Sequence, residues 1–358
     1  MLKPGATIGI LGGGQLGRML AIAAARLGFH CHIYCPEVAS PAFEVARAHT
    51  VAAYEDEAAL AMFAAAVDLV TLEFENVPVA ALRFLASRVP VAPSADALEI
   101  AQDRLAEKTF AARLGLGTAP FADVPNELAL YAAIARIGVP AILKTRRFGY
   151  DGKGQMKILA AVEAAAAITE MKGAPAILEG FVRFSREVSV VAARKADGDF
   201  APFDVTENEH RNHILDRSVA PARIAPATQA KAIAAARAIG EGLGYVGTFA
   251  VEFFVVGEGE SEDVIVNEIA PRVHNSGHWT LDGAITCQFE QHIRAIAGWP
   301  LGAPTRFADV EMLNFVGEGT SRWATLAAEP TTKIHLYGKA EIRDGRKMGH
   351  ATRLVFPG

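Results

Sequence analysis

Apolar and polar positions follow a strand-then-helix rhythm over the first 100 residues. Short apolar runs predict strands at 8–11, 30–34, 69–72 and 89–92. Segments with helical periodicity alternate with these runs and predict helices at 15–27, 57–66 and 79–86. Strands that alternate with helices indicate a parallel sheet with helices on both faces, so an α/β domain is expected here.

The rhythm changes after residue 98, where a helix is predicted over 98–114. The strands that follow are expected to pair with near neighbours, which indicates an antiparallel sheet and an α+β domain. The predicted strands lie at 139–143, 156–159, 176–178, 187–193, 247–256 and 264–269, and the predicted helices at 160–171, 228–242 and 285–297. Residues 300–358 hold short strands and many turns, which suggests a small appended β-rich lobe.

Composition narrows the functional class. The chain has 358 residues, enough for two or three domains, and a net charge of −5 at pH 7, which gives no electrostatic reason to expect a nucleic acid or a membrane surface as a partner. The cysteines Cys31, Cys35 and Cys287 form no paired framework, and free thiols fit a cytoplasmic location. No apolar run approaches a membrane span, and the chain enters a strand at once, so no signal peptide is expected.

The stretch from Lys144 to Gln155, K-T-R-R-F-G-Y-D-G-K-G-Q, is predicted to be the tip of a hairpin. Gly149, Gly152 and Gly154 allow the backbone to approach a ligand closely, and free N–H groups in such a turn can bind an anion. Positive charge is added by Lys144, Arg146, Arg147 and Lys153. These features predict a flexible lid over a polyphosphate; the alternative is an exposed hairpin whose charges are solvated.

A second glycine motif follows the first predicted strand and opens the first predicted helix. Gly12, Gly14 and Gly17 stand in G-x-G-x-x-G register, and Glu37 ends the next strand, about 20 residues further on as dinucleotide sites require. A nicotinamide-dependent oxidoreductase is therefore one hypothesis. The same turn can instead bind a single phosphate at the helix N-terminus, or only pack the helix against its strand.

Carboxylates interrupt two apolar strands and follow a third. Glu252 lies in V-E-F-F-V and Glu268 in V-I-V-N-E-I. Burial of a lone carboxylate is costly, so this pair suggests a shared Mg²⁺, unless both side chains reach solvent from an exposed sheet face. Glu73 and Glu75 follow the strand at 69–72 and share one face of an extended segment, at the edge where parallel sheets bind ligands; an ordinary charged loop is the alternative.

Further polar clusters lie in the second half of the chain. The loop A-P-R-V-H-N-S-G-H-W-T at 270–280 follows Glu268 at a strand end, a typical place for a site. Zinc could bind His274 and His278, but no further ligand is placed, so substrate contacts or structural roles are preferred. The C-terminal basic residues could bind a substrate phosphate or form a basic surface: Lys339, Arg343, Arg346, Lys347 and Arg353.

One cluster of potential metal ligands has a structural interpretation. His30, Cys31, His32 and Cys35 lie on a predicted strand. Side chains alternate between the faces of a strand, so the histidines point away from the cysteines. We expect a structural strand here and no metal site.

Taken together and in this order, these motifs resemble the ATP-grasp family, and more narrowly its 5-(carboxyamino)imidazole ribonucleotide synthetases. The similar stretches cover almost the whole chain and include G-I-L-G-G-G-Q-L-G-R-M-L, T-L-E-F-E-N-V-P, F-G-Y-D-G-K-G-Q, E-G-F-V, R-E-V-S-V, N-E-H-R-N-H-I, H-N-S-G-H-W-T, H-L-Y-G-K and G-R-K-M-G-H. Asp344 is a small departure, since proline is expected there. The resemblance implies a Rossmann-like domain at 1–100, an ATP-grasp domain at 101–298 and a small β-rich domain at 299–358.

The resemblance also implies roles for individual residues. ATP would lie between two halves of the central domain and contact Arg104, Lys144, Gly149, Tyr150, Asp151, Gly152, Lys153, Gly154, Gln155, Glu179, Gly180, Phe181, Val182, Glu187, His210, Asn267 and Glu268. Glu252 and Glu268 would ligate Mg²⁺, with two ions expected. The second substrate would contact Glu73, Tyr150, Asp151, Arg272, His274, Asn275 and Ser276, with Lys347 and Arg353 at its phosphate. Tyr150, Asp151 and Arg272 would be catalytic.

The implied reaction is the ATP-dependent carboxylation of 5-aminoimidazole ribonucleotide with bicarbonate, through carboxyphosphate, in purine biosynthesis. Carboxyphosphate hydrolyses readily, so a lid that excludes water suits this chemistry, and Asp151 would orient the amine or take its proton. The resemblance also implies a homodimer and no NAD. Glu37 would then be a bystander, and the glycine loop could hold the substrate phosphate in place of the C-terminal basic residues.

Three alternatives stay open. Another ATP-grasp ligase, such as a formate-using transformylase or a biotin carboxylase, would share the fold and differ in substrate. An oxidoreductase would leave the glycine-rich hairpin and the pair Glu252 and Glu268 without a role. A non-catalytic nucleotide-binding regulator would not need that pair or a lid.

Overall fold

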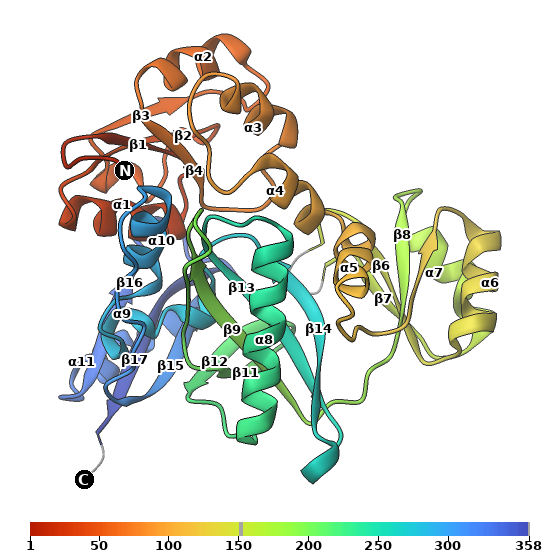
Figure 1. Cartoon of the computed structure of the whole chain (residues 1–358). Coiled ribbons are helices and arrows are strands. Elements are labelled where there is room, and N and C mark those ends of the chain that lie inside the picture. The colour runs from red at the N-terminus through yellow and green to blue at the C-terminus, as the bar shows by residue number, and fades with distance from the viewer. Residues whose placement is uncertain (150–152, 357–358) are drawn as a thin grey trace.

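The N-terminal part of the chain folds into a parallel sheet with helices around it (Figure 1). The computed structural model describes residues 1–149 and 153–356. The strands β1 (Thr7–Leu11), β2 (His30–Cys35), β3 (Ala48–Val51) and β4 (Leu69–Leu72) lie in the order β3-β2-β1-β4, all parallel. The helices are α1 (Gln15–Arg26), α2 (Glu57–Ala65) and α3 (Val79–Ala86). The predicted α/β domain is confirmed.

Two details of this domain differ from the prediction. Strand β3 was not predicted, because its sequence A-H-T-V is mostly exposed and has no apolar run. The predicted strand at 89–92 is reduced to a single bridge between Val70 and Val91. Both segments lie at the margins of the sheet, where little apolar surface is buried and the hydrophobic pattern is weak.

The helix predicted over 98–114 is two helices, α4 (Ala95–Gln102) and α5 (Arg104–Arg113). Asp103 between them is extended, and its carboxylate accepts hydrogen bonds from the backbone N–H groups of Leu105 and Ala106. Aspartate is a strong N-cap, so it begins a new helix here and does not continue the old one. The same carboxylate binds Arg146 at 2.7 Å, which ties the start of α5 to the end of β6.

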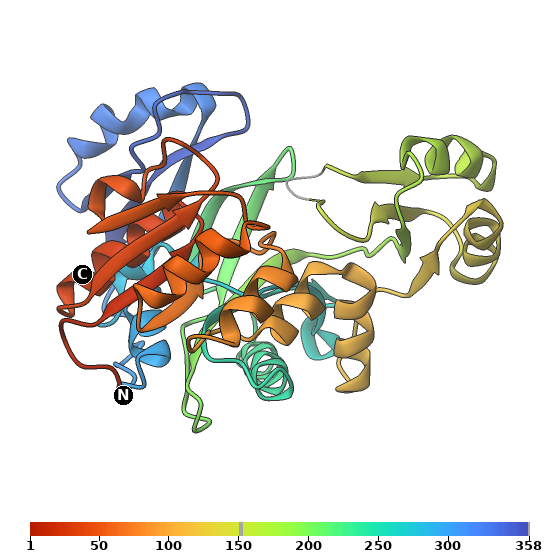
Figure 2. The same ribbon diagram turned by 90° about the horizontal axis from the view of Figure 1, so that it is seen from above.

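A four-stranded antiparallel sheet with two helices projects to one side of the molecule (Figures 1 and 2). Its strands lie in the order β5-β8-β6-β7: β5 (Phe121–Val124), β6 (Ala141–Thr145), β7 (Gln155–Ile158) and β8 (Ala176–Gly180), with helices α6 (Glu127–Ile137) and α7 (Ala164–Glu170). The predicted hairpin is confirmed, because β6 and β7 pair antiparallel with Lys144 opposite Gln155. Strand β5 and helix α6 were not predicted from the sequence.

The rest of the chain forms one large sheet. Its main path is β14-β13-β9-β11-β12-β15-β17-β16, and β10 pairs with β9 at its side. The strands are β9 (Arg186–Arg194), β10 (Phe200–Pro202), β11 (Thr206–Arg211), β12 (Ile214–Ala220), β13 (Gly247–Val256), β14 (Asp263–Ala270), β15 (Asp309–Val316), β16 (Thr332–Leu336) and β17 (Lys347–Val355). The helices are α8 (Pro226–Gly242), α9 (Thr280–Gly283), α10 (Gln288–Ile296) and α11 (Trp323–Ala327).

The C-terminal strands are a continuation of this sheet. Strand β15 pairs antiparallel with β12 and carries β17 and β16 beyond it. An exposed strand edge leaves backbone groups unpaired, and β15 covers the edge of β12. The small β-rich part that the sequence predicted is therefore joined to the central sheet by backbone hydrogen bonds.

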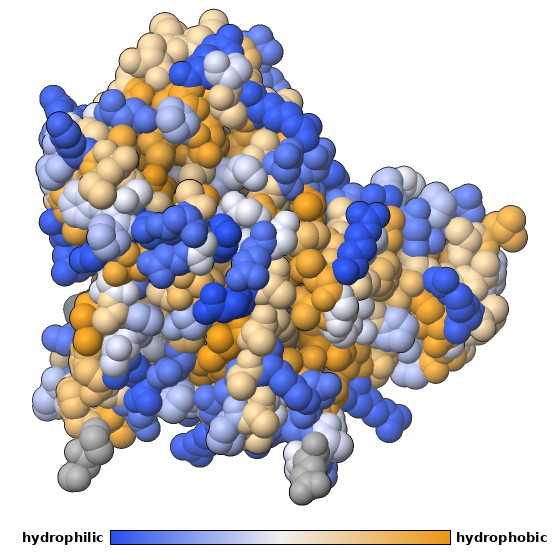
Figure 3. All heavy atoms as spheres, viewed as in Figure 1, coloured by the Kyte–Doolittle hydropathy of each residue, from blue (hydrophilic) through white to orange (hydrophobic). Residues whose placement is uncertain are grey.

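Helix α10 joins the N-terminal domain to the large sheet. Its Phe289, Ile293 and Ile296 belong to the same apolar cluster as residues of α1 and β1. Buried His292 of α10 bonds the Thr71 hydroxyl at 2.8 Å and accepts the Thr248 N–H at 3.0 Å, so one imidazole connects β4 with β13. On the face shown in Figure 3, hydrophilic and hydrophobic residues are mixed. Within the described residues, no helix combines the length and apolar character that a membrane span requires.

Substitution of Asp103 tests the break between α4 and α5. Asp103→Ala should lower the free energy of unfolding by about 1–2 kcal/mol, the usual effect of a lost N-cap. Asp103→Asn keeps a capping oxygen and loses the charge toward Arg146 and Arg147, so it should recover part of the stability. Urea denaturation of the three proteins measures the difference. Equal stability of Asp103→Ala and the unsubstituted protein would contradict this assignment.

Candidate functional site

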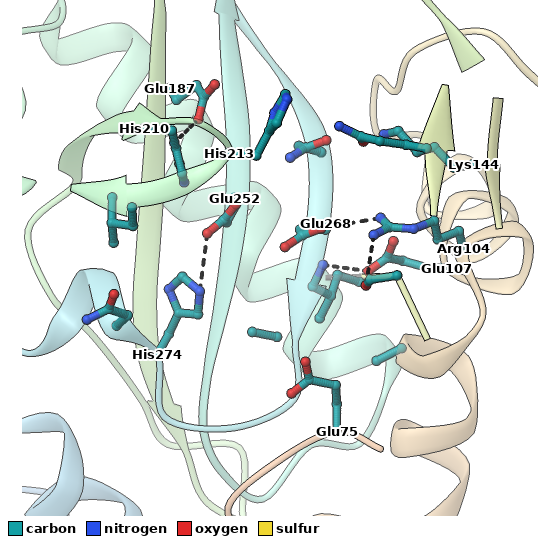
Figure 4. Close-up of a pocket in the computed structure, with 18 of the residues that line it drawn as sticks. Glu75, Arg104, Glu107, Lys144, Glu187, His210, His213, Glu252, Glu268 and His274 are labelled. Atoms are coloured by element: carbon teal, nitrogen blue, oxygen red, sulfur yellow. Dashed lines mark hydrogen bonds and ion pairs between the residues drawn. The ribbon is translucent and has the colours of Figure 1, made fainter. Parts of the chain in front are cut away.

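A cavity of about 740 Å³ opens where the small sheet, the large sheet and the segment after β4 meet (Figure 4). Residues from α5, β6, β9, β11, β13, β14 and β17 line it. It brings together most of the residues that the sequence predicted: Arg104, Lys144, Gly149, Gln155, Phe181, Glu187, His210, Glu252, Asn267, Glu268, Arg272, His274, Asn275 and Lys347. Positions separated by more than 200 residues therefore share one cavity.

Cations line the side of the cavity that faces the small sheet. Lys144 of β6 donates to Glu179 at 3.0 Å, and burial lowers the pKa of Lys144 although that carboxylate opposes the shift. Arg104 at the start of α5 donates to Glu268 at 3.3 Å and to the carbonyl of Gly149 at 3.4 Å (Figure 4). One guanidinium thus connects the tip of the glycine-rich hairpin with β14.

Glu179 anchors two buried lysines. Its Oε2 lies 3.0 Å from Lys144 Nζ and 3.6 Å from Lys108 Nζ, and all three side chains are largely buried. Burial alone would raise the pKa of Glu179, but Lys108 and Lys144 lower it to about 2. Lys108 also donates to the backbone carbonyl of Asn267 at 2.7 Å, which ties this cluster to β14. Among the described residues, Oε1 of Glu179 has no hydrogen-bond partner.

Carboxylates line the opposite side of the cavity. Glu252 of β13 stands directly across from Glu268 of β14, next to an irregularity in the pairing. Burial and then the charge of Glu268 raise the pKa of Glu252 to about 7. Glu107 of α5, which accepts the N–H of Ile269 at 2.5 Å, has its pKa raised to about 8, mainly by burial. For both carboxyl groups, burial outweighs the neighbouring positive charges and disfavours the charged form.

The pair Glu252 and Glu268 fits a magnesium ion. Mg²⁺ prefers oxygen ligands and takes one or two carboxylates together with phosphate oxygens and water. Across the ranges 1–149 and 153–356, no group of three or more acidic, histidine or cysteine side chains is arranged to hold a metal by itself. The pair would thus need ligands from a bound nucleotide. The same finding leaves the zinc alternative at His274 and His278 without support.

Two histidines bind carboxylates within the cavity (Figure 4). His210 Nδ1 bonds Glu187. Burial alone would lower the pKa of His210, but the Glu187 carboxylate raises it above its ordinary value. His274 Nε2 lies 3.2 Å from Glu252 Oε1. Burial and then the charge of Arg272 hold the pKa of His274 well below its ordinary value, so His274 is neutral.

Glu73 and Glu75 separate, although the sequence predicted that they share one face. Strand β4 ends at Leu72, so the segment turns and is not extended. Glu75 reaches the cavity and pairs with Arg272, which keeps the pKa of Glu75 low. Glu73 turns inward, is 7% exposed and accepts the N–H groups of Gly14 at 3.0 Å and Gly17 at 3.1 Å. The structure does not bring Glu73 into the cavity.

Three families match consecutive parts of the chain. Residues 5–102 match the ribonucleotide synthetase preATP-grasp domain, residues 109–289 the ATP-grasp domain, and residues 311–355 the phosphoribosylaminoimidazole carboxylase C-terminal domain. The chain is 50% identical over 355 residues to the N5-carboxyaminoimidazole ribonucleotide synthase of Brucella melitensis, with 99% of this chain and 97% of that protein covered. The chain belongs to the N5-carboxyaminoimidazole ribonucleotide synthase family of ATP-grasp ligases.

Solved structures of the family agree with this fold. The N5-carboxyaminoimidazole ribonucleotide synthetase of Thermus thermophilus superimposes with a TM-score of 0.91 at 47% identity, over 97% of this chain and 93% of that one. The Aspergillus clavatus synthase, in complex with ADP and 5-aminoimidazole ribonucleotide, has a TM-score of 0.91 at 29% identity, over 98% and 94%. The predicted order of a Rossmann-like, an ATP-grasp and a small C-terminal domain is confirmed.

The structure does not place every residue that the family resemblance predicted in the cavity lining. Tyr150, Asp151 and Gly152 fall outside the described residues. The lining does not include Lys153, Gly154, Glu179, Gly180, Val182 or Ser276, although Gly154, Glu179 and Ser276 contact residues next to it or in it. The roles of all these residues stay predictions.

Arg353 lies away from its expected place beside Lys347. It follows Lys347 by six residues on β17, a separation of about 20 Å along a strand. Its guanidinium binds Glu311 and, at 2.8 Å, Glu329. Lys339 is closer to the cavity, because its Nζ donates to the backbone carbonyl of Lys347 at 2.7 Å. The structure therefore does not bring Arg353 to the substrate side of the cavity.

Sequence reasoning missed several lining residues. Phe184 and Phe254 stack with ring centroids 4.5 Å apart, and Ile142, Glu107 and His213 also line the cavity. Phe254 sits two residues after Glu252 on the same strand, so the alternation of side chains could have indicated it. Glu107 and buried Lys108 lie on a helix that reads as an ordinary polar one, and nothing in the sequence marks them as buried.

Substitution of Glu179 tests how much this carboxylate stabilises the fold by compensating its two buried lysine partners. Glu179→Gln leaves the charges of Lys108 and Lys144 uncompensated, so the free energy of unfolding should fall by about 3–5 kcal/mol. Addition of Lys108→Met should recover part of the loss, because it removes one of the two orphaned charges. Urea denaturation of the single and double variants measures this coupling. Additive effects would mean that the lysine and the carboxylate do not interact.

Proposed function

We propose that this chain uses ATP and bicarbonate to carboxylate the exocyclic amine of 5-aminoimidazole ribonucleotide. The products are 5-(carboxyamino)imidazole ribonucleotide, ADP and phosphate, in purine biosynthesis. The observation that carries the proposal is the cavity in which Arg104 and Lys144 face the carboxylate pair Glu252 and Glu268. A related synthase whose fold matches over 98% of this chain contains ADP and 5-aminoimidazole ribonucleotide.

Arg104, Lys144 and the glycine-rich hairpin would hold the ATP phosphates. The unpartnered Oε1 of Glu179 offers an acceptor to the exocyclic amine of adenine, and Glu187 would accept from the ribose. When bound by Glu252 and Glu268, Mg²⁺ would offset phosphate charge and orient the γ-phosphate. Two ions, a homodimer and a cytoplasmic location stay predictions from the family resemblance.

The chemistry proceeds in two steps. A bicarbonate oxygen attacks the γ-phosphorus, the bond to ADP breaks with its electron pair on ADP, and carboxyphosphate forms. The amine then attacks the carbonyl carbon of carboxyphosphate, or the CO₂ that carboxyphosphate releases. The amine loses a proton, and phosphate leaves. Arg272, held in place by Glu75, would present a fixed positive charge to the developing anion. Asp151, outside the described residues, would orient the amine or accept its proton.

The substrate phosphate would bind the C-terminal basic residues. The N–H groups of Gly14 and Gly17 are engaged by Glu73, which argues against a phosphate or a dinucleotide in the glycine loop. Lys347 lines the cavity, and Lys339 lies beside it and donates to its backbone carbonyl. We therefore assign the phosphate to Lys339 and Lys347, and Lys339 takes the place of Arg353 in the predicted set.

Release of ADP tests the proposed reaction. With ATP, Mg²⁺ and bicarbonate, addition of 5-aminoimidazole ribonucleotide should stimulate ADP release strongly. Glu268→Gln should abolish the stimulation, while Glu241→Gln on the outer helix α8 should leave it unchanged. Stimulation by formate with another amine would favour a different ATP-grasp ligase. An absence of stimulation by the ribonucleotide would leave the fold standing and remove the substrate assignment.

Binding of the ribonucleotide should weaken as pH rises above 8. Burial, with the nearby charge of Arg346, lowers the pKa of Lys339 to about 8. Lys339 is therefore charged below pH 8 and neutral above it, and only the charged form attracts the phosphate. The KM for the ribonucleotide should rise between pH 7.5 and about 9.5 with little change in kcat. Lys339→Arg, which stays charged, should flatten the profile; a persistent rise would assign the titration to another group.

A further inference from the structure

A chain of buried hydrogen bonds leads from the middle of the large sheet to Glu252. The Ser218 hydroxyl donates to Asn208 Oδ1 at 2.8 Å, and Asn208 Nδ2 donates to Ser189 Oγ at 2.9 Å. Ser189 donates to Ser276 Oγ at 2.7 Å, and Ser276 Oγ lies 2.9 Å from His274 Nδ1. The five residues are at most 9% exposed. We call the four residues Ser218, Asn208, Ser189 and Ser276 the relay.

The relay has one direction. An amide nitrogen only donates, so Ser189 Oγ accepts from Asn208 and must turn its own proton toward Ser276. Ser276 Oγ accepts this hydrogen bond, so its own hydroxyl hydrogen is available to donate to His274 Nδ1. The backbone N–H of Ser276 also points at Nδ1, at 3.3 Å, and an N–H can only donate. Nδ1 of His274 is therefore an acceptor, and the ring proton lies on Nε2.

The protonated Nε2 faces Glu252. It lies 3.2 Å from Glu252 Oε1 and donates to that oxygen (Figure 4). The backbone of His274 is fixed as well, because Gln288 accepts its N–H at 2.9 Å and donates to its carbonyl at 2.8 Å. Ser189 stands directly across from Glu252 in the pairing of β9 with β13. The hydrogen-bonded chain therefore passes Glu252 at Ser189, its neighbour in the sheet, and ends at Glu252 through His274.

We propose that the relay is a positioning device that fixes His274 as the Nε2–H tautomer and thereby holds Glu252 in the orientation that receives a divalent cation. This role rests on the proposed function, in which Glu252 is a cation ligand. A donor on one oxygen of Glu252 restrains the carboxylate and leaves the other oxygen for the cation. Outer partners of this kind tune metal sites, and their loss weakens binding by about 10–100-fold.

The tautomer can be measured without any metal or activity. The protein labelled with ¹⁵N-histidine, with the His274 signals assigned by their loss in His274→Asn, should have a proton on Nε2 and none on Nδ1. Asn208→Asp replaces the amide donor by an acceptor of the same shape, so Ser189 should turn its proton toward residue 208. Ser276 would then bond Ser189 in preference to His274, so Nδ1 would lose its hydroxyl donor and keep only the backbone N–H of Ser276, and its ¹⁵N signal should shift. A proton on Nδ1 in the unsubstituted protein would overturn the proposal.

Cation binding gives the second readout. Mn²⁺ binding in the presence of ADP, followed by electron paramagnetic resonance, should weaken about tenfold in Asn208→Asp and less in Ser189→Ala, which keeps the Ser276 donor. Thr248→Val removes another buried hydroxyl from β13, the strand of Glu252, and should leave Mn²⁺ binding unchanged. Unchanged affinity and imidazole signals in both relay variants would refute the device. Failure of the unsubstituted protein to bind Mn²⁺ would instead remove the proposed cation site, and the tautomer would still decide the relay.

Discussion

Charge buried in the wall of the cavity must be balanced, and this constraint organises the rest of the structure. On the small-sheet side, the single carboxylate of Glu179 lies between Lys108 and Lys144 and offsets only one of their two positive charges. The carboxylates on the large-sheet side are balanced only in part, by Arg104 at 3.3 Å from Glu268. Attraction across a low dielectric is strong, so such a cavity is prepared for a ligand that carries both an anion and a cation. A nucleotide with its magnesium ion has that character.

The balance depends on contacts between parts of the chain that lie far apart in sequence. The N-terminal domain supplies Glu75, which fixes Arg272, and the C-terminal strands supply Lys347. Asn314 of β15 forms a reciprocal amide pair with Asn275 in the cavity wall, at 3.0 and 2.9 Å. Because β15 continues the central sheet, the third part of the chain is held in register with the carboxylates. The site is therefore a property of the whole molecule.

The sequence predicted the elements whose burial leaves a clear pattern. The strands at 69–72 and 247–256 and the helix at 79–86 match β4, β13 and α3 to the residue. It failed where tertiary contacts decide the outcome. Asp103 ends one helix and caps the next, exposed β3 carries no apolar run, and α6 and β5 were not predicted.

The candidate site follows the same division. Residues that stand inside readable motifs, such as Lys144, Glu252 and Glu268, do meet in the cavity. Residues whose importance comes only from burial, such as Lys108 and Asn208, could not be recognised, because an isolated sequence does not say which polar side chains lose contact with water. Arg353 was misplaced for a related reason, since its distance from Lys347 follows from the strand they share.

The glycine loop shows how a motif can keep its geometry and change its use. Gly12 has a φ of +102°, and an added Cβ would collide with Glu73, so the pattern of glycines remains necessary. The N–H groups that would face a pyrophosphate instead face the carboxylate of Glu73. An internal anion satisfies the helix N-terminus, and burial raises the pKa of that carboxyl despite these bonds. The loop therefore holds the end of β4 against α1. Glu75, two residues after the anchored Glu73, extends from this fixed segment into the cavity.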